Sequence, residues 1–131
     1  MLTFRPASLT TVGKRCCLWI QELMMVFVRL EFELGNLAFR SIQGATGTKD
    51  SFLKLCSGNV DLVDQIGEKV TRSAGFDKKF TVTGQTYSRL QDAAILGVLS
   101  LLGAAVHKIC MDLRMLQAFR EIQEPFESTQ V

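Results

Sequence analysis

The sequence predicts an all-α fold, a bundle of long helices, and two observations support this class. Residues 8–40 and 86–123 contain no proline and repeat apolar residues at intervals of three and four, the spacing of one helix face. A helix over residues 86–123 would be about 55 Å long at a rise of 1.5 Å per residue. That length exceeds the width of a compact domain of this size. We therefore expect long helices that lie side by side in an oligomer.

The composition fits a single compact domain over residues 1–131. Hydrophobic residues make up 47% of the 131 residues and the mean hydropathy is +0.19, which argues against disorder. A net charge of +2 with scattered basic residues argues against nucleic-acid binding. The longest uncharged run, 93–107, is shorter than the roughly 20 residues of a membrane helix. Residues 1–15 lack a signal-peptide core. We therefore expect no membrane segment and a cytoplasmic location.

The first long helix is expected over residues 8–40. Thr10 or Thr11 can cap its start by accepting a backbone N–H bond, and Gly35-Asn36 is a weak stop signal. One broad face is apolar, with Leu18, Trp19, Leu23, Val26, Phe27, Leu30, Leu34, Leu37 and Ala38.

A polar loop and shorter helices are expected next. Residues 41–51 are rich in Gly and Thr and are predicted to form a loop, in which Asp50 or Ser51 caps the short segment "FLKLC". Residues 59–75 are predicted to form a short helix with Asn59 or Asp61 as its cap and Gly75 as its stop.

The last long helix is expected over residues 86–123, and Pro125 is expected to end it. The segment "KKFTVT" before it is too short for a strand to be predicted. Within the helix, the apolar run is expected to be buried on most sides inside protein.

The motifs of the sequence give little support for a metal site or a nucleotide-binding P-loop. The four cysteines (Cys16, Cys17, Cys56 and Cys110) lack C-x-x-C spacing, and only one histidine is present, so we expect free thiols and no metal site. In "GATGTKDS" the two glycines are too close for a P-loop. The loop is expected to satisfy helix ends or to face a carboxylate or phosphate.

The segment "TGQTYSR" is the strongest candidate for a binding site. Gln85 offers donors and an acceptor for a planar polar ligand, and Gly84 allows an unusual backbone conformation. The hydroxyls of Thr83, Thr86 and Ser88 precede a helix start, where anions are favoured. Composition alone favours the simpler interpretation, a capped helix start.

Several ordered motifs together carry a resemblance: "GKRCCLWIQEL", "TGTKDSFL", "TGQTYSR", "LGAAVHKICMDLRML" and "QEPFE". They resemble the adenylosuccinate lyases of the animal type, within the fumarase/aspartase superfamily, from about Phe4 to Val131. The resemblance covers only the middle of a much longer enzyme. It implies homotetramers with cores of long helices and active sites assembled from three subunits. It also implies release of fumarate by β-elimination from adenylosuccinate, giving AMP, and from the succinyl-carboxamide intermediate of purine synthesis, with no metal or organic cofactor.

The resemblance also assigns site residues. The family has a catalytic histidine in a Thr-His-Phe-Gln-Pro-Ala segment, for which residues 1–7 are a remnant with Thr3 at the histidine position. Threonine cannot shuttle protons near neutral pH. The family's catalytic serine loop is expected to begin only after Val131, so no catalytic residue is retained. Gln85 matches a substrate-binding glutamine, and Thr46, Gly47 and Thr48 are expected near the same site.

The resemblance leaves open whether the chain is an enzyme, and we expect it to be inactive alone. The alternative is a non-catalytic helical module that assembles with itself or with the full-length lyase. A third interpretation is a product without settled function, because Val26, Val28 and Leu34 are more apolar than expected for the central helix.

Overall fold

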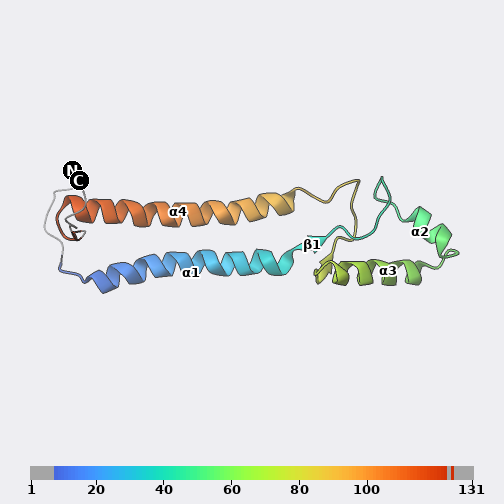
Figure 1. Ribbon diagram of the computed structural model, residues 1–131, viewed down its shortest axis with the longest axis horizontal. Coiled ribbons are helices and arrows are strands. Elements are labelled where there is room, and N and C mark those ends of the chain that lie inside the picture. Colours follow the sequence, from blue (N-terminus) through green and yellow to red (C-terminus); the bar gives the residue numbers. More distant parts are fainter. Residues whose placement is uncertain (1–7, 124, 126–131) are drawn as a thin grey trace. The chain divides into compact units, whose positions relative to one another are not determined.

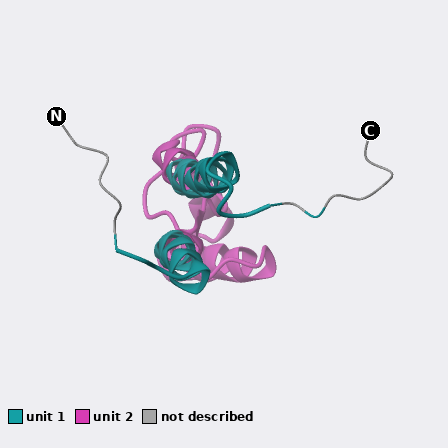
Figure 2. Cartoon of the chain, turned by 90° about the vertical axis from the view of Figure 1, so that its left-hand side faces the viewer, with its two compact units in different colours: residues 1–29, 97–131 teal, residues 30–96 magenta. Residues whose placement is uncertain are grey.

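The computed structural model describes residues 8–123 and residue 125, which form four helices and two short strands (Figure 1). The elements are α1 (Val12–Asn36), β1 (Ala38–Phe39), α2 (Asp50–Leu55), α3 (Val60–Ser73), β2 (Lys78–Lys79) and α4 (Leu90–Ala118). The all-α class with long helices is therefore confirmed. The contacts group the chain into two compact units (Figure 2). Unit 1 comprises residues 1–29 and 97–131, and unit 2 comprises residues 30–96.

Unit 1 is an antiparallel pair formed by the first part of α1 and the second part of α4. The Trp19 indole N–H donates to Asp112 Oδ2 at 2.8 Å, and the Lys108 ammonium donates to the same oxygen at 2.9 Å. Lys108 also lies 3.4 Å from Glu22. Both donors lower the pKa of Asp112, with the Trp19 hydrogen bond as the larger cause. This polar cluster fixes how the two helices align along their shared seam.

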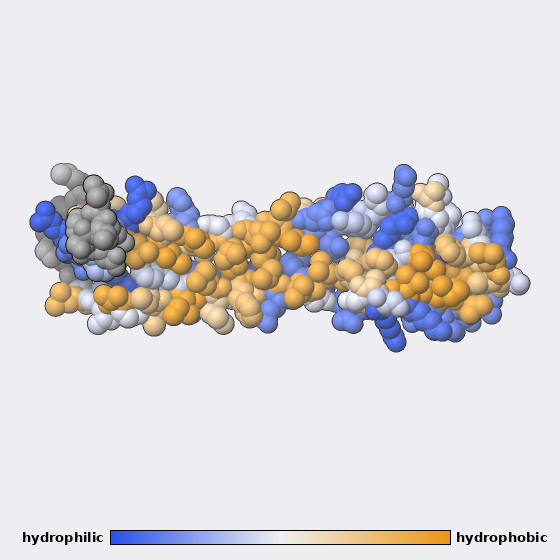
Figure 3. Space-filling model, in the orientation of Figure 1, coloured by the Kyte–Doolittle hydropathy of each residue, from blue (hydrophilic) through white to orange (hydrophobic). Residues whose placement is uncertain are grey.

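The apolar core of unit 1 is thin. Val98, Ala105 and Leu116 of α4 are buried, whereas α1 buries no residue. The expectation that the last helix is buried on most sides is wrong within this chain, because in unit 1 a single helix packs against it. Hydrophobic side chains spread over the surface seen in Figure 3. By length and composition α4 is able to cross a membrane. A single helix of this kind is weak evidence for a membrane segment, because core helices of soluble proteins have a similar length and composition.

The long helices are shorter than expected at both ends. Thr11 caps α1 as predicted, since its hydroxyl accepts the Lys14 N–H at 3.2 Å. The helix ends at Asn36 because the chain then enters β1. α4 begins at Leu90, four residues after the predicted start. It ends at Ala118, before Pro125 can act, because Arg120 takes a left-handed conformation with φ +58°.

Unit 2 holds the loops and the short helices. Asn59 caps α3 by accepting the Leu62 N–H at 3.1 Å, whereas neither Asp50 nor Ser51 caps α2, whose N-cap is Lys49. Gly75, at φ +82°, follows the end of α3 as predicted. The strands β1 and β2 pair in parallel, an element that the sequence did not predict.

Candidate functional site

The two loops that the sequence singled out meet within unit 2. We call residues 44–48 the glycine loop and residues 83–85 the TGQ turn. Gly47 has φ +82°, and a Cβ atom at this position would lie 2.0 Å from the Thr83 carbonyl oxygen and 2.9 Å from Gly84 Cα. Only glycine fits so close to another backbone. The backbone of Gly47 therefore lies against the backbone of Thr83 and Gly84, the two residues that precede Gln85.

Side chains from the segment between β1 and the glycine loop join the two. Arg40 Nη2 donates to the carbonyl oxygen of Gly44 at 2.9 Å and to that of Gly84 at 3.2 Å. The Thr83 hydroxyl donates to Gln43 Oε1. Thr83 is thus a bridge to Gln43, and its predicted role as a helix cap is wrong.

The glycine loop is closed by its own backbone. The Gly44 N–H donates to the Thr48 carbonyl at 2.7 Å, and the Gly47 N–H donates to the Gly44 carbonyl at 2.9 Å. Thr46 and Thr48 are exposed beside this closed ring. Both residues therefore lie at the surface, while hydrogen bonds within the loop hold its backbone together.

Gln85 lies at the exposed end of the TGQ turn. Its side chain makes no hydrogen bond to any residue that the structure describes, so its amide is available to a ligand. The side chains that join the two loops carry hydroxyl, amide and guanidinium groups. These groups can bind a polar ligand through hydrogen bonds. Thr3, which is expected at the family's histidine position, lies outside the described residues.

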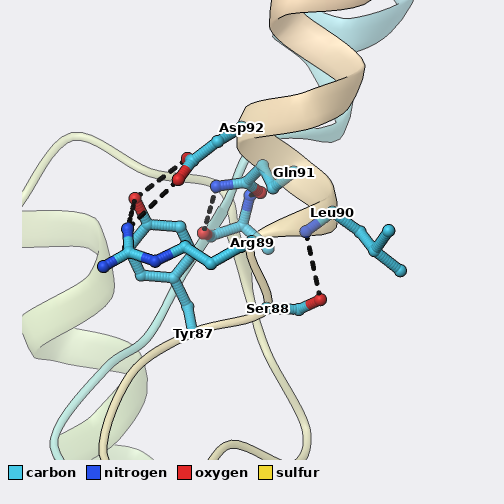
Figure 4. A network of polar contacts seen from close by, with 7 residues as sticks. Tyr87, Ser88, Arg89, Leu90, Gln91 and Asp92 are labelled. Atoms are coloured by element: carbon cyan, nitrogen blue, oxygen red, sulfur yellow. Dashed lines mark hydrogen bonds and ion pairs between the residues drawn. The ribbon is translucent and has the colours of Figure 1, made fainter.

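The chain after Gln85 forms a separate polar cluster before α4 (Figure 4). The Tyr87 hydroxyl donates to Asp92 Oδ1 at 3.0 Å, and Arg89 donates to both the Tyr87 hydroxyl and Asp92 Oδ2 at 3.1 Å. The Asp92 carboxylate raises the pKa of Arg89. Ser88 accepts the Leu90 N–H at 3.4 Å, which supports its predicted capping role. This cluster fixes the helix start and leaves Gln85 outside it.

Gln91 anchors the first turn of α4 to β1. Its side-chain carbonyl accepts the Ala38 N–H at 2.8 Å, and its amide nitrogen donates to the Ala38 carbonyl at 3.3 Å. Sequence reasoning missed Gln91, Arg40 and Gln43. Gln91 and Ala38 are separated by 53 positions, and Arg40 and Gly84 by 44, so no local pattern could have revealed these pairs.

Other candidate chemistry is sparse in the part of the chain that the structure describes. No group of three or more metal-binding side chains occurs among those residues. The four cysteines are free thiols. The site is therefore defined by the glycine loop, the TGQ turn and the two side chains that join them.

Comparison with known proteins identifies the chain's relatives, although no family model matches it. Adenylosuccinate lyase of Caenorhabditis briggsae is 53% identical over 128 residues, which cover 98% of this chain and 27% of the relative. Adenylosuccinate lyase of Saccharomyces cerevisiae is 47% identical over the same coverage of 98% and 27%. That of Schistosoma mansoni is 44% identical, covering 97% of this chain and 27% of the relative. The chain is therefore homologous to adenylosuccinate lyases along nearly its whole length, and it spans about 27% of the length of the curated relatives that it matches.

Proposed function

We propose that this chain contributes a substrate-binding element of the adenylosuccinate lyase type and does not catalyse the reaction by itself. The observation that carries the proposal is the 44–53% identity to adenylosuccinate lyases along 97–98% of the chain. The reaction implied is β-elimination of fumarate from adenylosuccinate and from the succinyl-carboxamide purine intermediate. A purine nucleotide is then the ligand, and the family's tetrameric assembly and cytoplasmic location belong to the same proposal.

Gln85 is the proposed substrate contact. Its side chain is exposed and makes no hydrogen bond to the described residues, which supports this role. An amide that was already hydrogen-bonded within the protein would have to break that bond before it could bind a ligand. Thr46 and Thr48 are proposed as neighbours of the ligand. Their support is the contact between Gly47 and the TGQ turn, which carries Gln85.

The proposed inactivity rests on Thr3. A proton has to leave the succinyl carbon and another has to reach the leaving nitrogen, and both transfers need groups that titrate near the working pH. A threonine hydroxyl does not titrate there. Gln85 can hold a ligand but cannot replace such a group.

The test separates binding from turnover. Purified chain is mixed with adenylosuccinate, fumarate release is followed by ultraviolet absorbance, and binding is measured by calorimetry. We expect binding that Gln85→Ala weakens and that Gln65→Ala, at an exposed glutamine of α3, leaves unchanged. No fumarate should appear. Turnover well above background contradicts the proposed inactivity, and equal binding by both variants contradicts the role of Gln85.

A second candidate function, a non-catalytic assembly module, is favoured by unit 1. Large apolar side chains of this unit remain exposed: Leu18, Ile20, Met24, Met25, Phe27, Val28, Leu99, Leu101, Val106 and Met115. A groove of about 570 Å³ between the two helices is lined partly by Met25, Val26 and Leu101. Exposed apolar surface of this extent is typical of an interaction face.

Assembly is tested by size-exclusion chromatography with light scattering, with and without a full-length adenylosuccinate lyase. The module hypothesis expects self-association or co-elution with the enzyme. A stable monomer that elutes apart from the enzyme contradicts it.

A further inference from the structure

We propose that Arg40 is the positioning residue of this site, which holds the TGQ turn against the glycine loop and so sets the place of Gln85. The inference rests on the proposed function, in which Gln85 contacts the substrate, and deepens it. Arg40 itself is not proposed to touch the ligand.

The geometry of Arg40 supports this role. One guanidinium nitrogen, Nη2, donates to a carbonyl in each of the two segments, Gly44 at 2.9 Å and Gly84 at 3.2 Å. Gly84 directly precedes Gln85. A single half-buried side chain therefore links the backbone beside the proposed contact to the closed ring of the glycine loop.

The TGQ turn has few other anchors. No atom lies within 4 Å of the position that a Cβ would take at Gly84, and the Gln85 side chain bonds to no described residue. What remains is the hydrogen bond from Thr83 to Gln43 and the close approach of Gly47. The turn is thus held through Thr83 and Gly84, and Arg40 bonds to the residue directly before Gln85.

The described partners of the Arg40 guanidinium are the carbonyl oxygens of Gly44 and Gly84. The guanidinium forms no ion pair with a described carboxylate, and its Nε atom is enclosed without a hydrogen-bond partner in the described part of the chain. Hydrogen bonds from a charged donor are stronger than neutral ones. The planar guanidinium keeps its donors in a fixed arrangement, whereas a lysine ammonium rotates freely. Arg40→Lys should therefore restore only part of what Arg40→Met removes.

A first experiment tests the positioning role without any ligand. Backbone amide exchange and ¹⁵N relaxation are measured on the full chain carrying Arg40→Met. The amides of Gly44 and Gly47, which close the glycine loop, should exchange roughly 10- to 100-fold faster, since a lost charged hydrogen bond changes an opening equilibrium by that order. The order parameter of Gln85 should fall, and the α3 amides should not change.

The matched control is Arg72→Met. Arg72 lies in the last turn of α3 and is exposed, and its side chain makes no hydrogen bond to a described residue, so the same atoms are removed without the loss of such a bond. This control should leave the glycine loop and Gln85 unchanged. If Arg40→Met also leaves them unchanged, or if Arg72→Met alters them equally, the positioning role of Arg40 is overturned.

A second experiment tests whether Arg40 acts through Gln85. Adenylosuccinate binding is measured for Arg40→Met, Gln85→Asn and the double variant. We expect Arg40→Met to weaken binding about tenfold or more in the parent chain, and to have little further effect beside Gln85→Asn. Fully additive losses would mean that Arg40 contacts the ligand directly and would overturn the assignment. If the parent chain does not bind adenylosuccinate, the proposed function fails, while the ligand-free exchange still decides the role of Arg40.

Discussion

Replacing Gly47 by alanine is expected to separate the glycine loop from the TGQ turn. The new Cβ would lie 2.0 Å from the Thr83 carbonyl oxygen and 2.8 Å from the Thr83 carbonyl carbon. Cβ atoms essentially never approach other atoms closer than 3.0 Å, so the Thr83 backbone has to retreat by about 1 Å. Both obstacles are backbone atoms, so rotating a side chain cannot relieve the clash.

Two costs add at this position. The conformation at φ +82° is left-handed, and a non-glycine residue there costs roughly 1–2 kcal/mol. The retreat also breaks the hydrogen bond from Arg40 to Gly84, which is 3.2 Å long already. A lost hydrogen bond to a charged group costs about 1.5–3 kcal/mol. We therefore expect Gly47→Ala to lower the free energy of unfolding by roughly 2.5–5 kcal/mol in total.

The variant Gly58→Ala measures the cost of the left-handed backbone conformation alone. Gly58 has φ +81° but nothing lies within 4 Å of its Cβ position, so only backbone strain applies, roughly 1–2 kcal/mol. Urea unfolding followed by circular dichroism measures both variants against the parent chain. The steric argument is refuted if Gly47→Ala costs no more than Gly58→Ala.

Three further predictions concern other parts of the chain. Asp112 has a pKa below its ordinary 3.8, so its stabilising contribution is present above that value and is lost as the pH falls through the folded-state pKa. Fluorescence of the single tryptophan, Trp19, should report this acid transition, and Asp112→Asn should remove it. Arg120→Gly should raise the free energy of unfolding by up to about 1 kcal/mol, because glycine adopts φ +58° without strain; an unchanged urea midpoint would count against this. Gln91→Leu should destabilise unit 2 by roughly 1–3 kcal/mol, because it leaves the Ala38 backbone unpaired, and faster exchange of the Ala38 amide would confirm the loss.

The fold class followed from the sequence because helix periodicity is local. The spacing of apolar residues along residues 8–40 and 86–123 corresponds to α1 and α4, and local caps such as Thr11 and Asn59 were recognised from side-chain chemistry alone. The ends of the helices were harder to predict from the sequence. Arg120 ends α4 in a conformation that usually takes glycine, so no breaker residue marked that end.

Some residues of the candidate site could also be named from the sequence, and others could not. Gln85, Thr46, Gly47 and Thr48 were assigned to the site because their motifs resemble those of the lyase family, whereas their chemistry alone favoured a capped helix start. Arg40, Gln43 and Gln91 were not named. Their partners lie 44, 40 and 53 positions away, and a single sequence does not show which distant backbone groups a side chain will meet.

By itself, then, the sequence determined the helical character of the chain, its kinship with the adenylosuccinate lyases and the polar segments that are candidates for binding. Only the tertiary structure decided that the glycine loop touches the TGQ turn, that Arg40 and Gln43 join them, and that much of the apolar surface of α1 and α4 stays exposed. The reason is physical. Periodicity and capping depend on neighbours within one helical turn, whereas loop contacts and burial depend on segments that the chain brings together only when it folds.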